Sequence, residues 1–293
     1  MLYDQISSNK RRSIILVALY FVLIVSLGFV FGKIFATPLT GMIFAFAFCI
    51  IMSLFSFFAG DSMLLAISGA RQVTKQENPY LVHTVEGLAI AAGLPTPKVF
   101  MIDDTAINAF ATGRDPQHAS ITVTRGTAEK LDRAELEGVI GHEMSHIKNF
   151  DIRLMMLVAV LVGAVAILSD FMIRSFLWGR KRNDRENSSA VFIIIGLALA
   201  VLAPIIAQLI KFTISRRREF LADADGALLT RNPQGLADAL KKIGKDKEVL
   251  EAANAATAPL YISNPLKNSA DFISKLFSTH PPLAERIKAL EAM

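Results

Sequence analysis

The stretch His142-Glu143-Met144-Ser145-His146 has the pattern H-E-x-x-H and lies in a segment whose apolar residues repeat at helical spacing. Residues four apart share one face of a helix, so the two imidazoles can bind one zinc ion together. Glu143 lies between them, where a general base would stand. The alternative is that both histidines are ordinary residues on a helix surface. The pattern therefore predicts a site for one zinc ion, to be tested against its surroundings.

The residues around this stretch predict where its helix begins. Asp132 is a suitable N-cap, and Glu135 follows three residues later, as in a capping box. Leu136, Val139 and Ile140 then repeat at three- and four-residue spacing. We expect one helix to carry both histidines on a single face.

A catalytic zinc takes three protein ligands and leaves one position open for water. Zinc proteases with a glutamate as third ligand place it on a second helix, with an aspartate four residues later. Glu219 and Asp223 show this spacing. We predict that Glu219 binds the metal and that Asp223 orients a ligand histidine through its other ring nitrogen. The alternative is that Glu219 pairs with an arginine of residues 216–218 and Asp223 is solvated.

The composition indicates membrane segments. The chain has 293 residues, is 53% hydrophobic and has a mean hydropathy of +0.44, which is high for a soluble enzyme. Four apolar runs account for this, at residues 14–31, 42–59, 154–169 and 191–210. A bilayer core is crossed by about 20 apolar residues, so we predict four hydrophobic helices. The alternative for the last two runs is a buried hairpin within one large domain.

The polar segments contain further predicted elements. Three short strands are expected at residues 98–102, 107–111 and 120–124, which are rich in β-branched and aromatic residues. Helices are expected from Asn78-Pro79 to Gly93, from Asn232-Pro233 to Gly244, and after Pro281-Pro282. Residues 251–270 are predicted to form a loop. The fold class is therefore a mainly α membrane protein whose polar parts form a zincin-like α+β domain with a small sheet.

Four motifs together resemble the HtpX-type membrane metalloproteases, bacterial relatives of the type I prenyl-protein protease. The matching residues are His142-Glu143-Met144-Ser145-His146, Glu219-Phe220-Leu221-Ala222-Asp223, Asn108-Ala109-Phe110-Ala111-Thr112-Gly113 and Thr279-His280-Pro281-Pro282. The order of apolar runs and motifs matches over essentially the whole chain. The resemblance implies a zinc endopeptidase with one Zn²⁺ per chain, which degrades damaged or misfolded membrane proteins at the cytoplasmic face.

Two more sites follow from this resemblance. Residues 107–111 are expected to be an edge strand that pairs with extended substrate, with Asn108, Ala109 and Phe110 as substrate-binding residues. The alternative is an inner strand with Asn108 in a turn. His280 is expected to hydrogen-bond the oxyanion of the transition state. Its alternative is a contact at the start of a helix with no catalytic role.

The predicted organisation has four parts. Residues 1–60 form an N-terminal transmembrane hairpin, 61–153 the first half of a cytoplasmic protease domain, 154–210 a second hydrophobic hairpin, and 211–293 the second half. Lys10, Arg11 and Arg12 precede the first run and place the N-terminus in the cytoplasm. The basic loop at residues 174–185 disagrees with this topology, so the second hairpin either crosses against that charge or does not fully cross. Both versions keep the two domain halves on one side of a multi-pass inner-membrane protein.

Other functions remain open at this stage. The protease could instead process one class of lipidated or signal-type substrate, or the chain could be a non-catalytic, zinc-stabilised scaffold or a transporter. The expected partners are membrane-protein or unfolded polypeptide substrates and the lipid bilayer. The net charge of +5 fits lysine and arginine facing anionic lipid, and no nucleic-acid motif is present. The single cysteine, Cys49, excludes an intrachain disulfide and a cysteine-based zinc site. The oligomeric state is not predicted.

Overall fold

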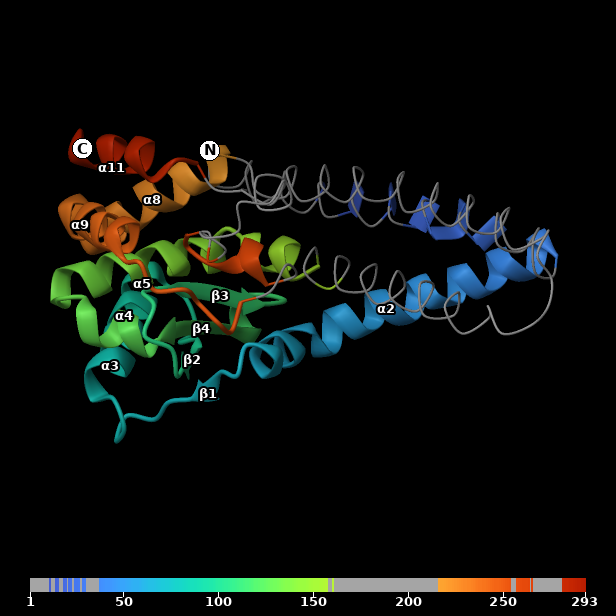
Figure 1. The fold of residues 1–293 in the computed structure, drawn as a ribbon, viewed down its shortest axis with the longest axis horizontal. Coiled ribbons are helices and arrows are strands. Elements are labelled where there is room, and N and C mark those ends of the chain that lie inside the picture. The colour runs from blue at the N-terminus through green and yellow to red at the C-terminus, as the bar shows by residue number, and fades with distance from the viewer. Residues whose placement is uncertain are drawn as a thin grey trace.

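The computed structural model describes residues 37–157, 216–253, 257–263 and 281–293, with residues 160 and 265 and part of residues 11–29. Its longest described element is helix α2, Pro38–Ile67, which projects away from the other labelled elements (Figure 1). Thr37 caps its start by accepting a hydrogen bond from the backbone N–H of Thr40, and Pro38 occupies the first turn. At 30 residues, α2 is about 45 Å long and exceeds the hydrocarbon core of a bilayer.

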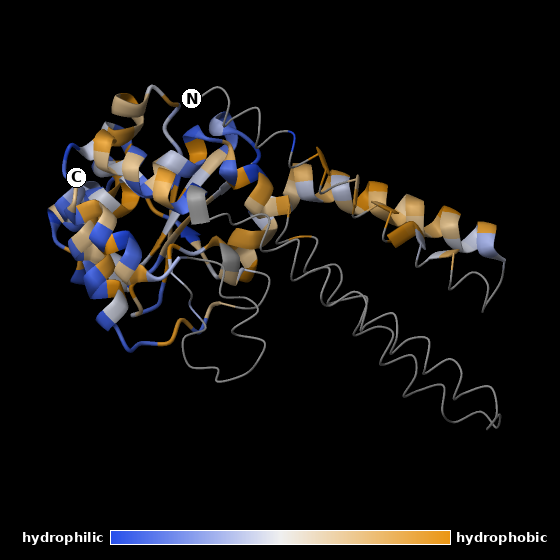
Figure 2. Cartoon of the chain, turned by 90° about the horizontal axis from the view of Figure 1, so that it is seen from above, coloured by the Kyte–Doolittle hydropathy of each residue, from blue (hydrophilic) through white to orange (hydrophobic). Residues whose placement is uncertain are grey.

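Helix α2 has the composition of a membrane span. Its mean hydropathy reaches 2.5 over 18 residues, and only 11% of that window is buried. Figure 2 shows that most residues along its length are hydrophobic. Among the residues described here, it is the one helix that is long and apolar enough to cross a membrane.

The other predicted apolar runs are described only in part. The described residues between 11 and 29 are helical, and so are 154–157 and 160, whereas residues 191–210 lie outside the described residues. Helix α2 continues past residue 60, the predicted end of the first hairpin, because its last turn enters the polar domain. There Leu64 and Leu65 are buried.

The sheet has four strands in the order β1-β2-β4-β3. They are β1 Arg71–Gln72, β2 Lys98–Ile102, β3 Ala109–Gly113 and β4 Ala119–Thr124. Strands β2 and β4 are parallel, with Val99 opposite Ile121, whereas β3 and β4 are antiparallel. Strand β3 therefore lies at an edge of the sheet, as predicted for residues 107–111, which overlap it.

Strand β3 begins two residues later than predicted. The backbone N–H of Ile107 donates to Asp246, and that of Asn108 donates to the hydroxyls of Thr124 and Thr127. These side-chain partners replace ladder hydrogen bonds, so regular pairing starts only at Ala109.

The helices of the polar domain start close to where the sequence predicts. Helix α3, Pro79–Ala92, is capped by Asn78 and ends at Gly93, whose φ of 67° is the left-handed conformation that glycine adopts readily. Helix α9, Pro233–Lys245, runs one residue beyond the predicted end at Gly244. The others are α4 Arg125–Lys130, α5 Arg133–Lys148, α8 Arg216–Thr230 and α11 Leu283–Glu291, with the short turns η1 Pro116–His118 and η2 Ala258–Leu260. The turn η2 interrupts the predicted loop at 251–270.

Helix α5 is the centre of the domain (Figure 1). The capping box of Asp132 and Glu135 starts it as predicted, and Lys242 of α9 binds the Glu135 carboxylate at 2.6 Å. One face of the sheet packs with α3 and α5 into a core that also contains residues of α8 and α9. The other face, including Phe110, packs against Leu64 and Tyr261. All five residues of the motif on α5 are buried.

Candidate metal centre

Two glycines let α5 and α8 approach closely beside the motif. A β-carbon on Gly226 of α8 would lie 2.9 Å from the backbone nitrogen of His142. One on Gly141 of α5 would lie 3.2 Å from the carbonyl oxygen of Gly226. Because neither glycine has a side chain, the two backbones meet directly. This contact brings Glu219 of α8 to the histidines of α5.

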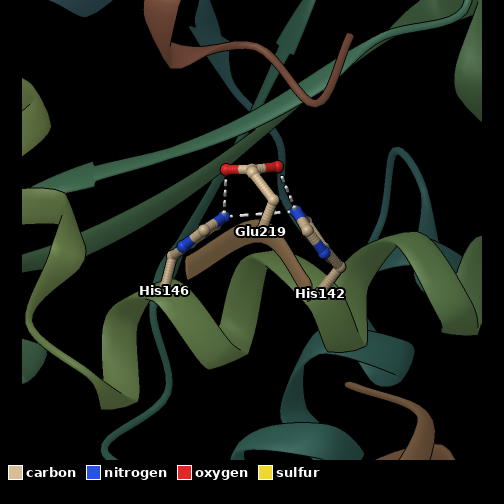
Figure 3. A group of neighbouring side chains, drawn as sticks. All are labelled: His142, His146 and Glu219. Carbon is tan, nitrogen blue, oxygen red and sulfur yellow. Dashed lines mark hydrogen bonds and ion pairs between the residues drawn. The ribbon is translucent and has the colours of Figure 1, made fainter. Parts of the chain in front are cut away.

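Three side chains converge between these helices (Figure 3). The Nε2 atoms of His142 and His146 are 3.2 Å apart. The Glu219 oxygens lie 3.8 Å from Nε2 of His142 and 3.7 Å from Nε2 of His146. Ligands about 2.0–2.1 Å from a tetrahedral zinc lie roughly 3.3–3.4 Å from one another, so the spacing fits a zinc ion. The structure thus brings together the three residues predicted as ligands.

Each histidine turns its other ring nitrogen toward an aspartate. Nδ1 of His142 is 2.9 Å from Oδ1 of Asp223, which agrees with the predicted orienting role. Nδ1 of His146 is 3.1 Å from Oδ2 of Asp151, a residue that the sequence did not suggest. Burial alone lowers the pKa of His146, but the hydrogen bond to Asp151 and the neighbouring carboxylates raise it to about 9. In both pairs the aspartate faces Nδ1, leaving Nε2 directed toward the other ligands.

Arg286 of α11 is a second residue that the sequence analysis missed. It is fully buried and donates two hydrogen bonds to Asp223, at 2.8 and 2.7 Å. A further bond of 3.0 Å reaches the carbonyl oxygen of Ile262, and Glu219 lies 3.5 Å away. Burial alone raises the pKa of Asp223, but the guanidinium holds it well below its usual range. Asp223 is therefore an ionised acceptor for His142.

The buried charges also fit a divalent cation. Among the described residues, four carboxylates are buried here with two guanidinium groups. They are Glu143, Glu219, Asp151 and Asp223, with Arg218 and Arg286. With the four carboxylates ionised and both histidines neutral, as metal ligands must be, two negative charges are left over, which one Zn²⁺ would balance, and buried charge is costly unless it is paired.

Glu143, the predicted general base, is a buried residue of α5 between the two histidines. It is 1% exposed, and its Oε1 atom has no hydrogen-bond partner among the described residues. Burial raises the pKa of its carboxyl above the ordinary value, against the lowering effect of the neighbouring histidines. An unpartnered buried carboxylate oxygen of this kind fits a role toward a substrate or water.

The predicted substrate strand contacts a distant part of the chain. The N–H of Ile262 donates to the carbonyl of Ala109 at 2.9 Å, on the edge of β3. The amide of Asn108 donates to the carbonyl of Ser263 at 3.3 Å, and Tyr261 packs edge-to-face on Phe110. Residues 261–263 therefore run beside the start of this edge strand. The substrate-binding role of residues 108–110 stays a prediction.

His280 lies outside the described residues, so its predicted role stays a prediction too. The alternative for Glu219 was an ion pair with an arginine of residues 216–218. Of these arginines, Arg218 forms an ion pair with Asp151, at 3.5 Å. Asp151 and Arg286 gave no signal in the sequence. Asp151 stands five residues after His146, off the helical spacing, and Arg286 is 63 residues from Asp223.

Comparison with known proteins agrees with this geometry. The profile of peptidase family M48 matches residues 75–293. The protein named "Protease HtpX homolog" from Dictyoglomus turgidum (strain DSM 6724 / Z-1310) is 46% identical over 291 residues, which is 99% of this chain and 94% of that one. The protein of the same name from Thermoanaerobacter pseudethanolicus (strain ATCC 33223 / 39E) is 40% identical over 296 residues, covering 100% and 98%.

A solved structure shows the same fold. The crystal structure of S. mikatae Ste24p aligns with a TM-score of 0.51 at 19% identity, and the alignment covers 98% of this chain and 66% of that chain. The profile spans most of the chain, and the two relatives match over nearly their whole length. This chain therefore belongs to peptidase family M48 and is a membrane zinc metalloprotease.

Proposed function

We propose that His142, His146 and Glu219 hold the zinc ion, and that Glu143 is the general base of peptide-bond hydrolysis. The convergence of three ligand atoms beside a buried carboxylate carries this proposal. Zinc, when bound, supplies a Lewis acid that polarises the scissile carbonyl and acidifies the attacking water. Glu143 takes the proton from that water and delivers it to the leaving amine. Asp223 keeps His142 in the tautomer that presents Nε2 to the metal.

We further propose that the substrates are unfolded or damaged polypeptides, membrane proteins among them. The site is deeply buried, since His142 and Glu219 are 0% exposed and His146 is 4% exposed. A folded protein cannot reach such a site, whereas an extended chain can enter along the edge of a sheet. Ala109 already accepts a hydrogen bond from Ile262, so a paired substrate either displaces residues 261–263 or extends along the remainder of β3.

We also propose that both halves of the domain face the cytoplasm in a multi-pass membrane protein. The basic residues before the first apolar run support this orientation. Lys245 is an exposed residue at the end of α9, and a cysteine there is a suitable reporter once Cys49 is replaced. Labelling of that cysteine by an impermeant thiol reagent only from outside the cell would exclude the orientation.

The experiment that tests the mechanism compares Glu143→Gln with Glu137→Gln. Both changes replace a carboxylate with an amide on α5, but Glu137 pairs with Arg133 at 3.0 Å and lies away from the ligands. We expect both purified full-length variants to retain zinc. Cleavage of an unfolded protein such as casein should fall about 10²–10⁴-fold in Glu143→Gln alone. Wild-type turnover in that variant would contradict the mechanism. If the wild-type protein bound zinc but cleaved no substrate, the alternative of a non-catalytic, zinc-stabilised scaffold would be favoured.

A further inference from the structure

Each histidine of the metal centre has a buried aspartate at its Nδ1 atom. Asp223 lies four residues after Glu219, at helical spacing, whereas Asp151 lies five residues after His146 and does not fit that spacing. We propose that Asp151 is a positioning residue for His146 and that Arg218 fixes Asp151. The inference rests on the proposed role of His146 as a zinc ligand. Asp151 is 0% exposed, and its two oxygens face different partners. Oδ2 lies 3.1 Å from Nδ1 of His146, and Oδ1 lies 3.5 Å from Nη1 of Arg218.

The backbone between the two residues is shaped for this contact. On an unbroken helix, a residue five positions after His146 would lie about 140° around the axis and could not face its ring. Helix α5 instead ends at Lys148, and Phe150 takes a φ of 59° before helical conformation resumes at Asp151. A positive φ is uncommon and strained for an aromatic residue, so it persists where the surroundings enforce it. This turn directs Asp151 back toward the histidine.

Arg218 links this aspartate to the third ligand. It is 6% exposed and immediately precedes Glu219 on α8, so two adjacent residues of one helix contact different parts of the metal site. Glu219 faces the ligand nitrogens, while Arg218 holds the carboxylate behind His146. The opposite side has a similar but closer pair, because Arg286 donates hydrogen bonds of 2.8 and 2.7 Å to Asp223, which lies behind His142.

An aspartate at Nδ1 of each histidine has a chemical consequence for metal binding. A histidine that binds a metal through Nε2 must keep its proton on Nδ1, and an ionised carboxylate at Nδ1 secures that tautomer and fixes the ring plane. A buried carboxylate is costly unless it is paired, and an arginine beside it provides the opposite charge. Each ligand histidine thus has its own arginine-backed aspartate, and the two pairs come from separate segments of the chain.

The test compares Asp151→Asn with Asp225→Asn in the purified full-length protein. Asp225 is a half-buried carboxylate on α8 that accepts a hydrogen bond from Asn149 at 3.0 Å, which makes it a matched control. Zinc affinity is measured by competition with a chelator. We expect affinity about 10–100-fold weaker in Asp151→Asn and unchanged in Asp225→Asn. Equal affinity in the two variants would overturn the proposal.

A second measurement separates ligand positioning from general damage to the fold. Cobalt in place of zinc reports ligand geometry through its visible absorption bands, and these should shift in Asp151→Asn but not in Asp225→Asn. Unshifted bands in Asp151→Asn would count against the proposal. His146→Ala separates the two levels of inference. If it retains wild-type zinc affinity, the ligand assignment itself fails. If it loses zinc while Asp151→Asn does not, only the positioning role fails.

The turn at Phe150 offers a test that leaves Asp151 in place, in case Asp151→Asn does not fold. Phe150→Gly and Phe150→Ile both remove the aromatic ring, but only isoleucine resists a positive φ. We expect Phe150→Gly to bind zinc at least 10-fold more tightly than Phe150→Ile. Equal affinities would show that the turn does not position Asp151 for His146.

Discussion

Replacing Gly226 with alanine tests whether the contact of α5 with α8 sets the geometry of the metal site. The added β-carbon would lie 2.9 Å from the backbone nitrogen of His142 and 3.0 Å from the carbonyl carbon of Gly141. Both are backbone atoms of a buried helix and cannot rotate away as a flexible side chain does. We expect the helices to separate by about 0.5 Å to restore ordinary contact in a close-packed interior.

The expected loss of stability is modest. Overpacking a buried contact costs about 1–3 kcal/mol. Alanine in place of glycine within a helix returns about 1 kcal/mol. The net destabilisation should be about 0–2 kcal/mol, which leaves the protein folded. The effect on the metal should be larger, because Glu219 is on α8 and both histidines are on α5. We expect zinc affinity to fall about 10-fold or more, comparable with loss of an orienting contact.

Gly87→Ala is the matched control. Gly87 lies within α3, and a β-carbon there meets nothing within 4 Å. This change should raise stability by about 0.5–1 kcal/mol and leave zinc affinity unaltered. The two variants are compared by thermal unfolding and by chelator competition. If Gly226→Ala were as stable as Gly87→Ala and bound zinc like the wild type, the close contact of the helices would not set the site.

Three further predictions address single residues. Glu219→Ala should lose most bound zinc, because two histidines remain for an ion that needs three protein ligands; full occupancy by metal analysis would require another ligand. Asn108→Ala should lower kcat/KM with zinc content unchanged, since its amide anchors Ser263 beside the predicted substrate strand; unchanged kinetics would contradict a role of Asn108 in substrate binding. Asp246→Asn should lower Tm at pH 7. Burial alone raises the pKa of Asp246, but hydrogen bonds from Ile107 and other neighbours lower it. The ionised carboxylate of Asp246 therefore stabilises the fold above about pH 4, and this stabilisation is lost as the pH falls through the lowered pKa. The difference in Tm between the wild type and Asp246→Asn should narrow at low pH.

Much of the site follows from local sequence because helix geometry fixes local spacing. The capping box at Asp132 and Glu135 and the four-residue interval from His142 to His146 determine a helix with both imidazoles on one face. The same interval places Glu219 and Asp223 on one face of α8. Strand β2 has its predicted bounds, because β-branched and aromatic residues between turn signals mark a strand without reference to the rest of the chain.

The contacts between distant segments depended on the tertiary structure. The sequence did not show that Gly141 and Gly226 would meet, because a glycine within a helix carries no mark of its partner. The sequence predicts a helix over the segment that contains Arg286 but gives no partner for this residue, and packing of that helix buries it against Asp223. Apolar periodicity shows which face of a helix is buried, but it does not show which other element covers that face.

Irregular backbone conformations also could not be predicted from the sequence. Asp151 reaches His146 only because Phe150 adopts a positive φ, which the residue itself disfavours. Strand β3 starts at Ala109, and not at Ile107, because Asp246, Thr124 and Thr127 take the hydrogen bonds of the two preceding residues. The sequence by itself determined the candidate ligand residues and their helices, since these rest on spacing along one element. Only the tertiary structure decided which side chains hold those ligands in place, since these contacts join elements that local spacing cannot relate.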